Sequence, residues 1–461
     1  MSKETARQWV HIGSGLFALL LRYLTWWQAA ALAIAALLFN AFVLPRIGGR
    51  RLYRPIDEAR GFPIGILLYP LSVLILVVAF PDRPDLAAAA WGILAVGDGA
   101  ATLVGRAAAR TRPGRAGFRR TDRDDRVPAS RLPWNAEKTI AGTTAFFVFG
   151  ALAGVGLAGW TRPALTPAPP LLFSLTAPIA AAAAAALVET IPVRLDDNIS
   201  VPLVAAAMLW LTSLIAVDAA EASREAVARH LPWAIGVNAI VALLGYRART
   251  VSTSGLIGGA VIGIIIYATG GPASWALLFV TFFLAAVTSR LGLERKALLG
   301  IAEERGGRRG AGNAIANCGV AAIAALAGVF TPHPMLAWLA FVAALTAGGS
   351  DTVASEIGKA WGRATFLVTT LSRVRPGTPG AMSLEGTAAG LVAAFALAAF
   401  AARLGLILSG AILTVVIAAT VGALVESALA ATLEAPGIVN NDILNFINTA
   451  VAAVTALAIA S

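Results

Sequence analysis

The stretch WGILAVGDGAATLVGR (91–106) places one carboxylate, that of Asp98, in a run of residues that is otherwise apolar enough for a membrane. A second stretch of the same kind, LTAGGSDTVASEIGK (345–359), carries Asp351. An ionised carboxylate in the middle of a membrane helix costs roughly 3 kcal/mol on insertion scales. We therefore expect each of these acids to belong to a functional site or, alternatively, to a polar contact between helices.

The composition indicates a polytopic membrane protein. Of the 461 residues, 58% are hydrophobic and only 13% are charged, which leaves too few polar side chains to cover a soluble globule. Apolar runs of about 17–25 residues match the thickness of a bilayer core, so we predict an all-α protein with about fifteen membrane helices. The predicted spans are 9–23, 27–45, 63–80, 86–105, 139–160, 171–190, 200–217, 232–246, 254–270, 273–289, 313–330, 335–352, 386–403, 405–428 and 443–460.

The net charge of +11 does not indicate a nucleic-acid partner, because the Lys and Arg residues lie in short connections between apolar runs. These basic connections follow the even-numbered spans, so they share one side of the membrane. The positive-inside rule makes that side cytoplasmic. We expect a protein of a bacterial-type inner membrane or its equivalent, with the N-terminus in the cytoplasm.

Cysteine and histidine usage limits the kinds of metal site. The single cysteine is Cys318, and the three histidines, His11, His230 and His333, are scattered along the chain. This pattern excludes an internal disulfide framework and a multi-cysteine metal site, and it offers no histidine cluster with the spacing of metal ligands.

The two acid-bearing stretches belong to an internal repeat. When Asp98 is set on Asp351, DGAATLVGRAAAR and DTVASEIGKAWGR align without gaps and share Ala at the third following position, Gly at the seventh, and bases at the eighth and twelfth. On a helix the offsets 3, 4, 7 and 8 lie along one face. Small residues on that face permit close approach of a neighbouring helix or of a phosphate.

Two further elements follow in the same order in both halves. KTIAGTTAF, from Lys138, aligns with MSLEGTAAG, from Met382, and a later segment sets Glu189 on Glu426. Three matched elements in one order indicate two related halves. We predict membrane domains at 1–217 and 231–461, joined by a polar linker at 218–230.

Acids and amides in these elements are candidates for catalysis and metal binding, because hard oxygen ligands suit Mg²⁺. For the acid and amide clusters, helix capping is the alternative. The catalytic candidates are Asp98, Glu189, Asp351, Glu356 and Glu426, and the candidate metal ligands are Asp98, Asp197, Asn198, Asp351, Asn441 and Asp442.

Bases and glycine- or hydroxyl-rich turns follow each acid and predict a polyphosphate site. Bases neutralise phosphate oxygens, and glycine lets backbone N–H groups approach an anion. Loops on the positive side of a membrane also contain such bases without any site. The candidate nucleotide- and phosphate-binding residues are Arg106, Arg110, Lys138, Thr139, Gly142, Thr143, Lys359, Arg363, Ser383, Gly386 and Thr387.

The first half resembles the CTP-dependent polyprenol kinases, phytol kinase foremost. It has Gln8 where that family usually has Lys, and Thr139 where Ser is usual, but neither change removes an acid or a base of the proposed site. The segments that carry the resemblance are RQWVHIGSG (7–15), GDGAATLVGR (97–106), NAEKTIAGT (135–143) and ETIPVRLDDNISVPL (189–203).

The second half resembles the membrane family that includes the phytyl-phosphate kinase of the tocopherol pathway. The resemblance is weaker at Glu426, where Asp is expected. The segments that carry it are STSGLIGGAVIG (252–263), RGAGNAIANCGV (309–320), SDTVASEIG (350–358), VRPGTPGAMSLEGT (374–387) and VESALAATLE (425–434).

Together the two resemblances imply a natural fusion of two consecutive kinases. The first half would convert phytol or a similar isoprenoid alcohol to its monophosphate, and the second would convert the monophosphate to the diphosphate, with CTP as donor and Mg²⁺ as cofactor. The prenyl tail would stay in the lipid bilayer while both sites lie at the cytoplasmic face.

Two other functions stay open. A membrane cytidylyltransferase would move CMP onto a lipid phosphate and release pyrophosphate instead of CDP. A transporter with duplicated halves would carry its acids near the middle of the bilayer.

Overall fold

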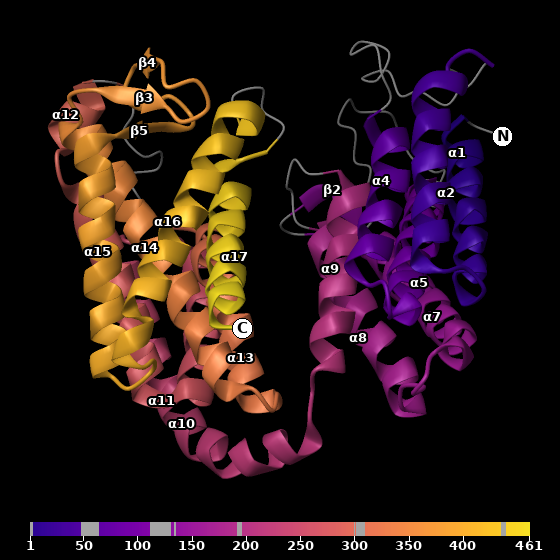
Figure 1. Cartoon of the computed structure of the whole chain (residues 1–461), viewed down its shortest axis with the longest axis horizontal. Coiled ribbons are helices and arrows are strands. Elements are labelled where there is room, and N and C mark those ends of the chain that lie inside the picture. The colour runs from indigo at the N-terminus through magenta and orange to yellow at the C-terminus, as the bar shows by residue number, and fades with distance from the viewer. Residues whose placement is uncertain are drawn as a thin grey trace, which may run out of the picture. The chain divides into compact units, whose positions relative to one another are not determined.

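The computed structural model describes residues 3–47, 64–110, 131–132, 135–190, 196–298, 300, 309–434 and 439–461. The chain divides into two compact units, Met1–Ser213 and Leu214–Ser461. Both units are bundles of helices (Figure 1), which confirms the predicted all-α membrane fold.

Unit 1 is built around one long helical stretch formed by α5, η4 and α6. Its middle section, η4, is a π-helical turn that ends at Asp98, and such wide turns are common at functional sites. The elements of the unit are α1 (Lys3–Ser14), η1 (Gly15–Arg22), α2 (Trp26–Leu38), η2 (Phe39–Val43), α4 (Ile64–Ala79), α5 (Pro84–Gly92), η4 (Ile93–Asp98), α6 (Gly99–Arg110), β1 (Arg131–Leu132), β2 (Asn135–Thr139), α7 (Ile140–Thr161), η5 (Arg162–Ala164), α8 (Leu171–Thr190) and α9 (Asp197–Ser213).

Unit 2 adds a small antiparallel sheet to its helices. The strand order is β4-β3-β5, and β5 leads directly into α15. The elements are α10 (Val217–Arg247), α11 (Thr253–Arg290), α12 (Leu293–Leu298), α13 (Ala311–Phe330), α14 (Pro334–Trp361), β3 (Thr365–Leu367), β4 (Arg373–Val374), β5 (Ala381–Ser383), α15 (Leu384–Arg403), η7 (Ser409–Ala411), α16 (Ile412–Leu429), η8 (Ala430–Glu434) and α17 (Asn441–Ala460).

The predicted count of fifteen spans is not confirmed. In the described part of the chain, eleven helices are long and apolar enough to cross a membrane. The predicted spans 9–23, 63–80 and 200–217 fall on helices that are shorter than these eleven or that change their hydrogen-bonding pattern. The predicted spans 254–270 and 273–289 both lie in α11. Residues 218–230, expected to form a linker, are helical and belong to the first part of α10.

Helix α11 is broken where the sequence predicts a boundary between two spans. Gly271 has φ +66° and ψ −162°, a conformation that only glycine adopts without strain. Pro272 follows and has no N–H to donate to the preceding turn. A Cβ added to Gly271 would also lie 2.8 Å from the His230 ring, so a side chain is excluded at this position by space as well as by backbone conformation.

The helix that carries each repeated acid is the most enclosed helix of its unit. In the apolar window of Pro84–Ala108, 67% of the residues are buried, compared with 17–39% for the other candidate spans of unit 1. The corresponding value for Pro334–Trp361 is 78%, compared with 11–39% in the rest of unit 2. Asp98 and Asp351 therefore lie on helices that are surrounded mainly by protein.

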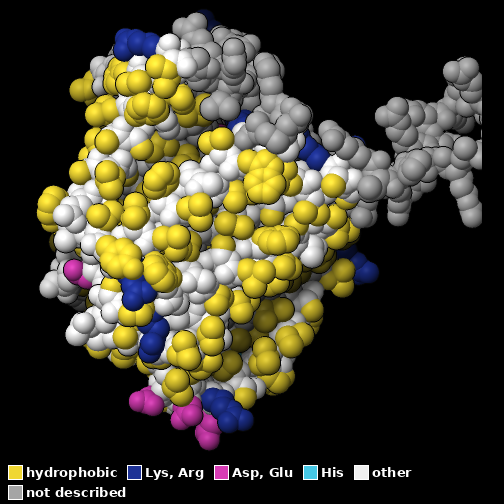
Figure 2. Space-filling model, turned by 90° about the vertical axis from the view of Figure 1, so that its right-hand side faces the viewer, with side chains coloured by type: hydrophobic (Ala, Val, Ile, Leu, Met, Phe, Trp, Pro, Cys, Tyr) yellow, Lys and Arg dark blue, Asp and Glu magenta, His cyan; other side chains and the backbone are white. Residues whose placement is uncertain are grey.

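The outer surface is apolar, as expected for helices that face lipid. Large side chains such as Trp9, Phe17 and Trp27 are more than half exposed. On the face drawn in Figure 2, hydrophobic side chains are spread over the described surface, and charged side chains are few. This surface, together with the eleven apolar helices, makes the chain an integral membrane protein.

Candidate active sites

The same capped turn begins the helix that packs against each acid-bearing helix. Thr139 caps α7, and its Oγ1 accepts a hydrogen bond from the backbone N–H of Gly142 at 3.1 Å. Ser383 caps α15 in the same way, with a 3.0 Å bond from the N–H of Gly386. The aligned Thr/Ser and Gly positions of the sequence repeat therefore occupy equivalent places in the two units.

These two glycines permit close contact between the capped turn and the acid-bearing helix. A Cβ added to Gly142 would lie 3.1 Å from the carbonyl oxygen of Ala101, and one added to Gly386 would lie 2.5 Å from that of Ala354. Ala101 and Ala354 are the alanines at the third position after the repeated acids. The predicted close approach along the Asp–Ala–Gly face is thus present in both units.

Unit 1 brings three carboxylates together from three elements. Oxygen atoms of Asp98 on η4, Glu189 on α8 and Asp197 on α9 all lie within 4.8 Å of one another. The ammonium group of Lys138 on β2 forms ion pairs with Glu189 and, at 3.3 Å, with Asp197. Four of the predicted site residues therefore form one cluster.

The excess of negative charge in this cluster favours binding of a divalent cation. Burial alone would lower the pKa of Lys138, but the carboxylates of Asp197 and Glu189 raise it above its usual value, so the lysine stays charged. Among the residues that the structure describes, the ammonium group of Lys138 is the one that pairs with this group of three carboxylates. Glu189 Oε2 is buried and has no hydrogen-bond partner among the residues that the structure describes. A group of carboxylate ligands that supplies only oxygen atoms, one of them without a hydrogen-bond partner, suits Mg²⁺.

His11 is a residue of this site that the sequence reasoning missed. Its Nε2 atom lies 3.6 Å from Asp98 Oδ2, and its ring packs edge-on against Tyr69 with the centroids 4.7 Å apart. Both rings line a largely apolar cavity of about 590 Å³. The segment RQWVHIGSG contained the signal, but no spacing in the sequence pointed from His11 to Asp98.

The other predicted residues of unit 1 lie around this cluster. Asn198 donates a hydrogen bond to Asp196 at 2.6 Å and lines the apolar cavity. The hydroxyl oxygen of Thr143 is buried with no partner in the described part of the chain. Arg106 is exposed on α6, and the side chain of Arg110 lies outside what the structure describes.

Unit 2 places its repeated acid against the acid that aligns with Glu189. The side chains of Asp351 on α14 and Glu426 on α16 line the same pocket and interact with each other, and Asn448 donates a hydrogen bond to Glu426 Oε2 at 3.2 Å. Two neighbouring carboxylates repel each other, so a proton or a cation between them stabilises the pair.

The two acids open into a polar pocket of about 410 Å³. Asn441 and Asn445 also line this pocket. Carboxylate and amide side chains supply the oxygen ligands that suit Mg²⁺. The structure brings eight predicted site residues to this one pocket: Asp351, Glu356, Lys359, Ser383, Gly386, Thr387, Glu426 and Asn441.

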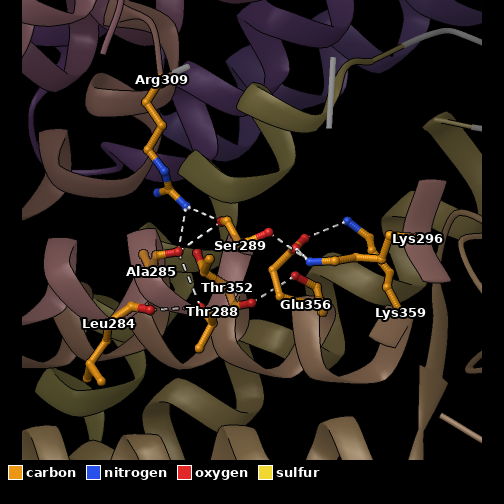
Figure 3. Close-up of polar contacts among 10 residues, drawn as sticks. Leu284, Ala285, Thr288, Ser289, Lys296, Arg309, Thr352, Glu356 and Lys359 are labelled. Carbon is orange, nitrogen blue, oxygen red and sulfur yellow. Dashed lines mark hydrogen bonds and ion pairs between the residues drawn. The ribbon is translucent and has the colours of Figure 1, made fainter. Parts of the chain in front are cut away.

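Glu356, which lines this pocket, is held by two lysines (Figure 3). Lys296 on α12 donates a 2.6 Å hydrogen bond to Oε2, and Lys359 donates a 3.0 Å bond to Oε1. Lys296 also donates to the backbone oxygen of Ser289 at 2.9 Å. Glu356 and Lys296 are 2% and 1% exposed, so this ion pair is buried.

Replacing Lys296 by Met should destabilise unit 2. Removing one partner of a buried ion pair costs about 3–5 kcal/mol, and we expect the lower end because Lys359 still neutralises Glu356. The midpoint of thermal unfolding in detergent measures the loss. The double variant Lys296→Met/Glu356→Met should recover most of it, because it also removes the buried carboxylate. A double variant as unstable as the single one would contradict the uncompensated charge of Glu356 as the cause.

Two predicted residues of unit 2 lie outside the pocket wall. Arg363 is exposed, and its backbone N–H donates to Glu385 at 3.3 Å. Asp442 lies beside the first turn of α13, where a Cβ added to Gly312 would be 2.5 Å from its Oδ2.

Sequence reasoning also missed residues of the pocket that come from distant elements. Arg309, which precedes α13, lines the pocket wall together with Asn313 and the loop 376–380. The segments RGAGNAIANCGV and VRPGTPGAMSLEGT contained these residues, yet nothing in the repeat indicated that they face Asp351.

The comparisons with known proteins agree with the membrane fold. Residues 236–453 match the model of a family described as integral membrane protein DUF92. Over 203 residues, 43% of this chain and 78% of the relative, the chain is 42% identical to an uncharacterized membrane protein of Synechocystis sp.. It is 33% identical to the chloroplastic protein VTE6 of Arabidopsis thaliana over 233 residues, 49% of this chain and 70% of VTE6.

A third relative has a name that states an activity. Over 232 residues, 46% of this chain and 68% of the relative, the chain is 29% identical to the probable phytol kinase 1, chloroplastic, of Glycine max. No solved structure matches the chain. In each of these three alignments, less than half of this chain matches more than two thirds of the relative.

Proposed function

Because the chain belongs to the DUF92 family of integral membrane proteins, we propose that it is a membrane kinase of isoprenoid substrates. In this proposal, unit 1 phosphorylates phytol or a similar prenol, unit 2 phosphorylates the resulting monophosphate, and CTP is the donor in both steps. The observation that carries it is the repeated pair of acids: Asp98 lies beside Glu189, and Asp351 lies beside Glu426. The name of the Glycine max relative supports the prenol.

In unit 1, the apolar cavity would hold the prenyl chain with the hydroxyl group near His11 and Asp98. The hydroxyl oxygen forms a bond to the γ-phosphorus of CTP, the bond from that phosphorus to the β–γ bridging oxygen breaks, and CDP leaves. Asp98 or His11 accepts the hydroxyl proton. Lys138 neutralises phosphate oxygens, as bases do in other phosphoryl-transfer sites.

Asp98, Glu189 and Asp197 would hold Mg²⁺ in unit 1, and Asp351, Glu426 and Asn441 would do so in unit 2. When bound, Mg²⁺ neutralises the charge of the transferred phosphoryl group. In unit 2, an oxygen of the prenyl monophosphate is the nucleophile and carries no proton that must be removed, so positioning and charge neutralisation are the main work of this site.

Both sites would face the cytoplasm, where the nucleotide is found, and the N-terminus would lie on the same side. The bias of basic residues towards the connections after even-numbered predicted spans supports this orientation. The prenyl chain would remain in the bilayer, and no nucleic acid takes part.

Purified protein with γ-labelled CTP, Mg²⁺ and geranylgeraniol or phytol tests the proposal. We expect label in the lipid monophosphate and diphosphate, with release of CDP. Transfer of CMP to a lipid phosphate with release of pyrophosphate would favour a cytidylyltransferase instead. Absence of labelled lipid from every prenol and prenyl phosphate tried would contradict the kinase.

A further inference from the structure

Unit 2 contains a second, apolar cavity beside the polar pocket. This apolar chamber has a volume of about 140 Å³ and lies among α10, α11, α13 and α14, with Val241, Leu256, Ile262, Leu278, Phe279 and Cys318 in its wall. Three residues, Arg309, Asn313 and Thr352, line both the chamber and the polar pocket. The two cavities therefore adjoin at Arg309.

Arg309 brings an unneutralised charge to this junction (Figure 3). Its guanidinium group donates to Ser289 Oγ at 3.2 Å and to the backbone oxygen of Ala285 at 3.5 Å. It also donates to Asn313 Oδ1 at 3.4 Å, so all three acceptors are neutral. No carboxylate of the described residues lies within ion-pair distance of it. A half-buried cation without a counter-ion favours an anionic ligand, and the planar guanidinium group suits phosphate.

We propose that the apolar chamber and Arg309 form the binding site for an isoprenyl monophosphate, an inference that rests on the proposed function of unit 2. The phosphate binds Arg309 at the junction and points into the pocket that contains Asp351 and Lys359. The first isoprene unit occupies the chamber.

The volume of the apolar chamber limits how much of the prenyl chain it can hold. An apolar protein cavity of about 150 Å³ accommodates one benzene molecule, so a chamber of about 140 Å³ holds roughly one five-carbon unit. The rest of the prenyl chain must therefore pass between helices to reach the lipid. Phe279 in the chamber wall is 39% exposed on the apolar surface, and we place the exit to the lipid there.

Binding of geranyl monophosphate to the intact protein in nanodiscs, without nucleotide, tests the role of Arg309. Arg309→Gln should weaken this binding about 10- to 100-fold, the range for losing hydrogen bonds to a charged group. Arg309→Lys should restore part of the affinity, and geraniol binding should not change. Equal affinities of wild type and Arg309→Gln for the monophosphate would overturn the proposal, as would an equal loss of geraniol binding.

Gly259→Leu tests the chamber itself. Gly259 lines the chamber, and a Cβ added to it meets no atom within 4 Å, so a leucine fills space without a backbone clash. We expect weaker binding of both dimethylallyl and geranylgeranyl monophosphate. Gly236→Leu is the matched control, because Gly236 is also unobstructed, lies in α10 and does not line the chamber. If Gly259→Leu weakens binding of geranylgeranyl monophosphate alone, the chamber does not bind the first isoprene unit.

The outcomes separate this inference from the kinase proposal. If the wild type binds the monophosphate through Arg309 but transfers no label from CTP, the kinase proposal fails and the binding site stands. If labelled diphosphate forms equally well in wild type, Arg309→Gln and Gly259→Leu, the kinase proposal stands and the binding site fails.

Discussion

Asp351→Asn is expected to stop formation of the diphosphate, so that the monophosphate accumulates when the protein is given a prenol and CTP. The substitution keeps the size of the side chain but removes the charge that faces Glu426 in the polar pocket. Loss of one electrostatic group in a phosphoryl-transfer site costs about 100-fold or more in rate. Separation of labelled mono- and diphosphates over time measures the effect.

Asp218→Asn provides the control for this experiment, because Asp218 is an exposed acid on α10 that lines neither cavity of unit 2. It should leave both steps at the wild-type rate. An unchanged midpoint of thermal unfolding for Asp351→Asn would exclude a damaged fold. Diphosphate formation at the wild-type rate by Asp351→Asn would contradict the assignment of Asp351 to the second site.

The sequence repeat predicted the framework of both sites because it records local geometry. Spacings of three and seven residues fix which side chains share one face of a helix, and a Thr or Ser before Gly at the third following position is the pattern of a helix cap. Gly142 and Gly386 accordingly occupy equivalent contacts. The alignment of Glu189 with Glu426 likewise identified the second acid of each pair.

The cations of the two sites could not be predicted from the repeat, because they come from elements that differ between the halves. Lys138 aligns with Met382, so unit 2 has no base at that place. Its buried lysine, Lys296, comes from the short helix α12, and Arg309 comes from the residues before α13. Which distant element reaches a site depends on tertiary packing, and a single sequence does not specify that packing.

The number of spans could not be fixed from hydropathy, which measures the length of an apolar run but not the geometry between two runs. The runs 254–270 and 273–289 both lie in α11, and the backbone is non-helical at Gly271 between them. The same limitation hid His11, which lies on α1 and reaches Asp98 only because α1 packs beside the start of α6.

Asp98→Asn is expected to lower the rate of phosphorylation of added prenol by about 100-fold or more. Conversion of added prenyl monophosphate should continue at the wild-type rate. Asp98 is one of three acids in its cluster and contacts His11 at the end of the apolar cavity, whereas the pocket around Asp351 belongs to unit 2 and has its own pair of acids. Supplying prenol and monophosphate in separate assays with γ-labelled CTP measures the two steps independently.

The pair of variants decides whether the units work as two enzymes. If Asp98→Asn removes only the first step and Asp351→Asn only the second, a mixture of the two variants should again produce diphosphate from prenol, because monophosphate made by the Asp351→Asn protein serves the intact second site of the other. If either substitution abolishes both steps while thermal unfolding is unchanged, the carboxylates of both units contribute to one composite activity, and the proposal of two consecutive kinases is wrong.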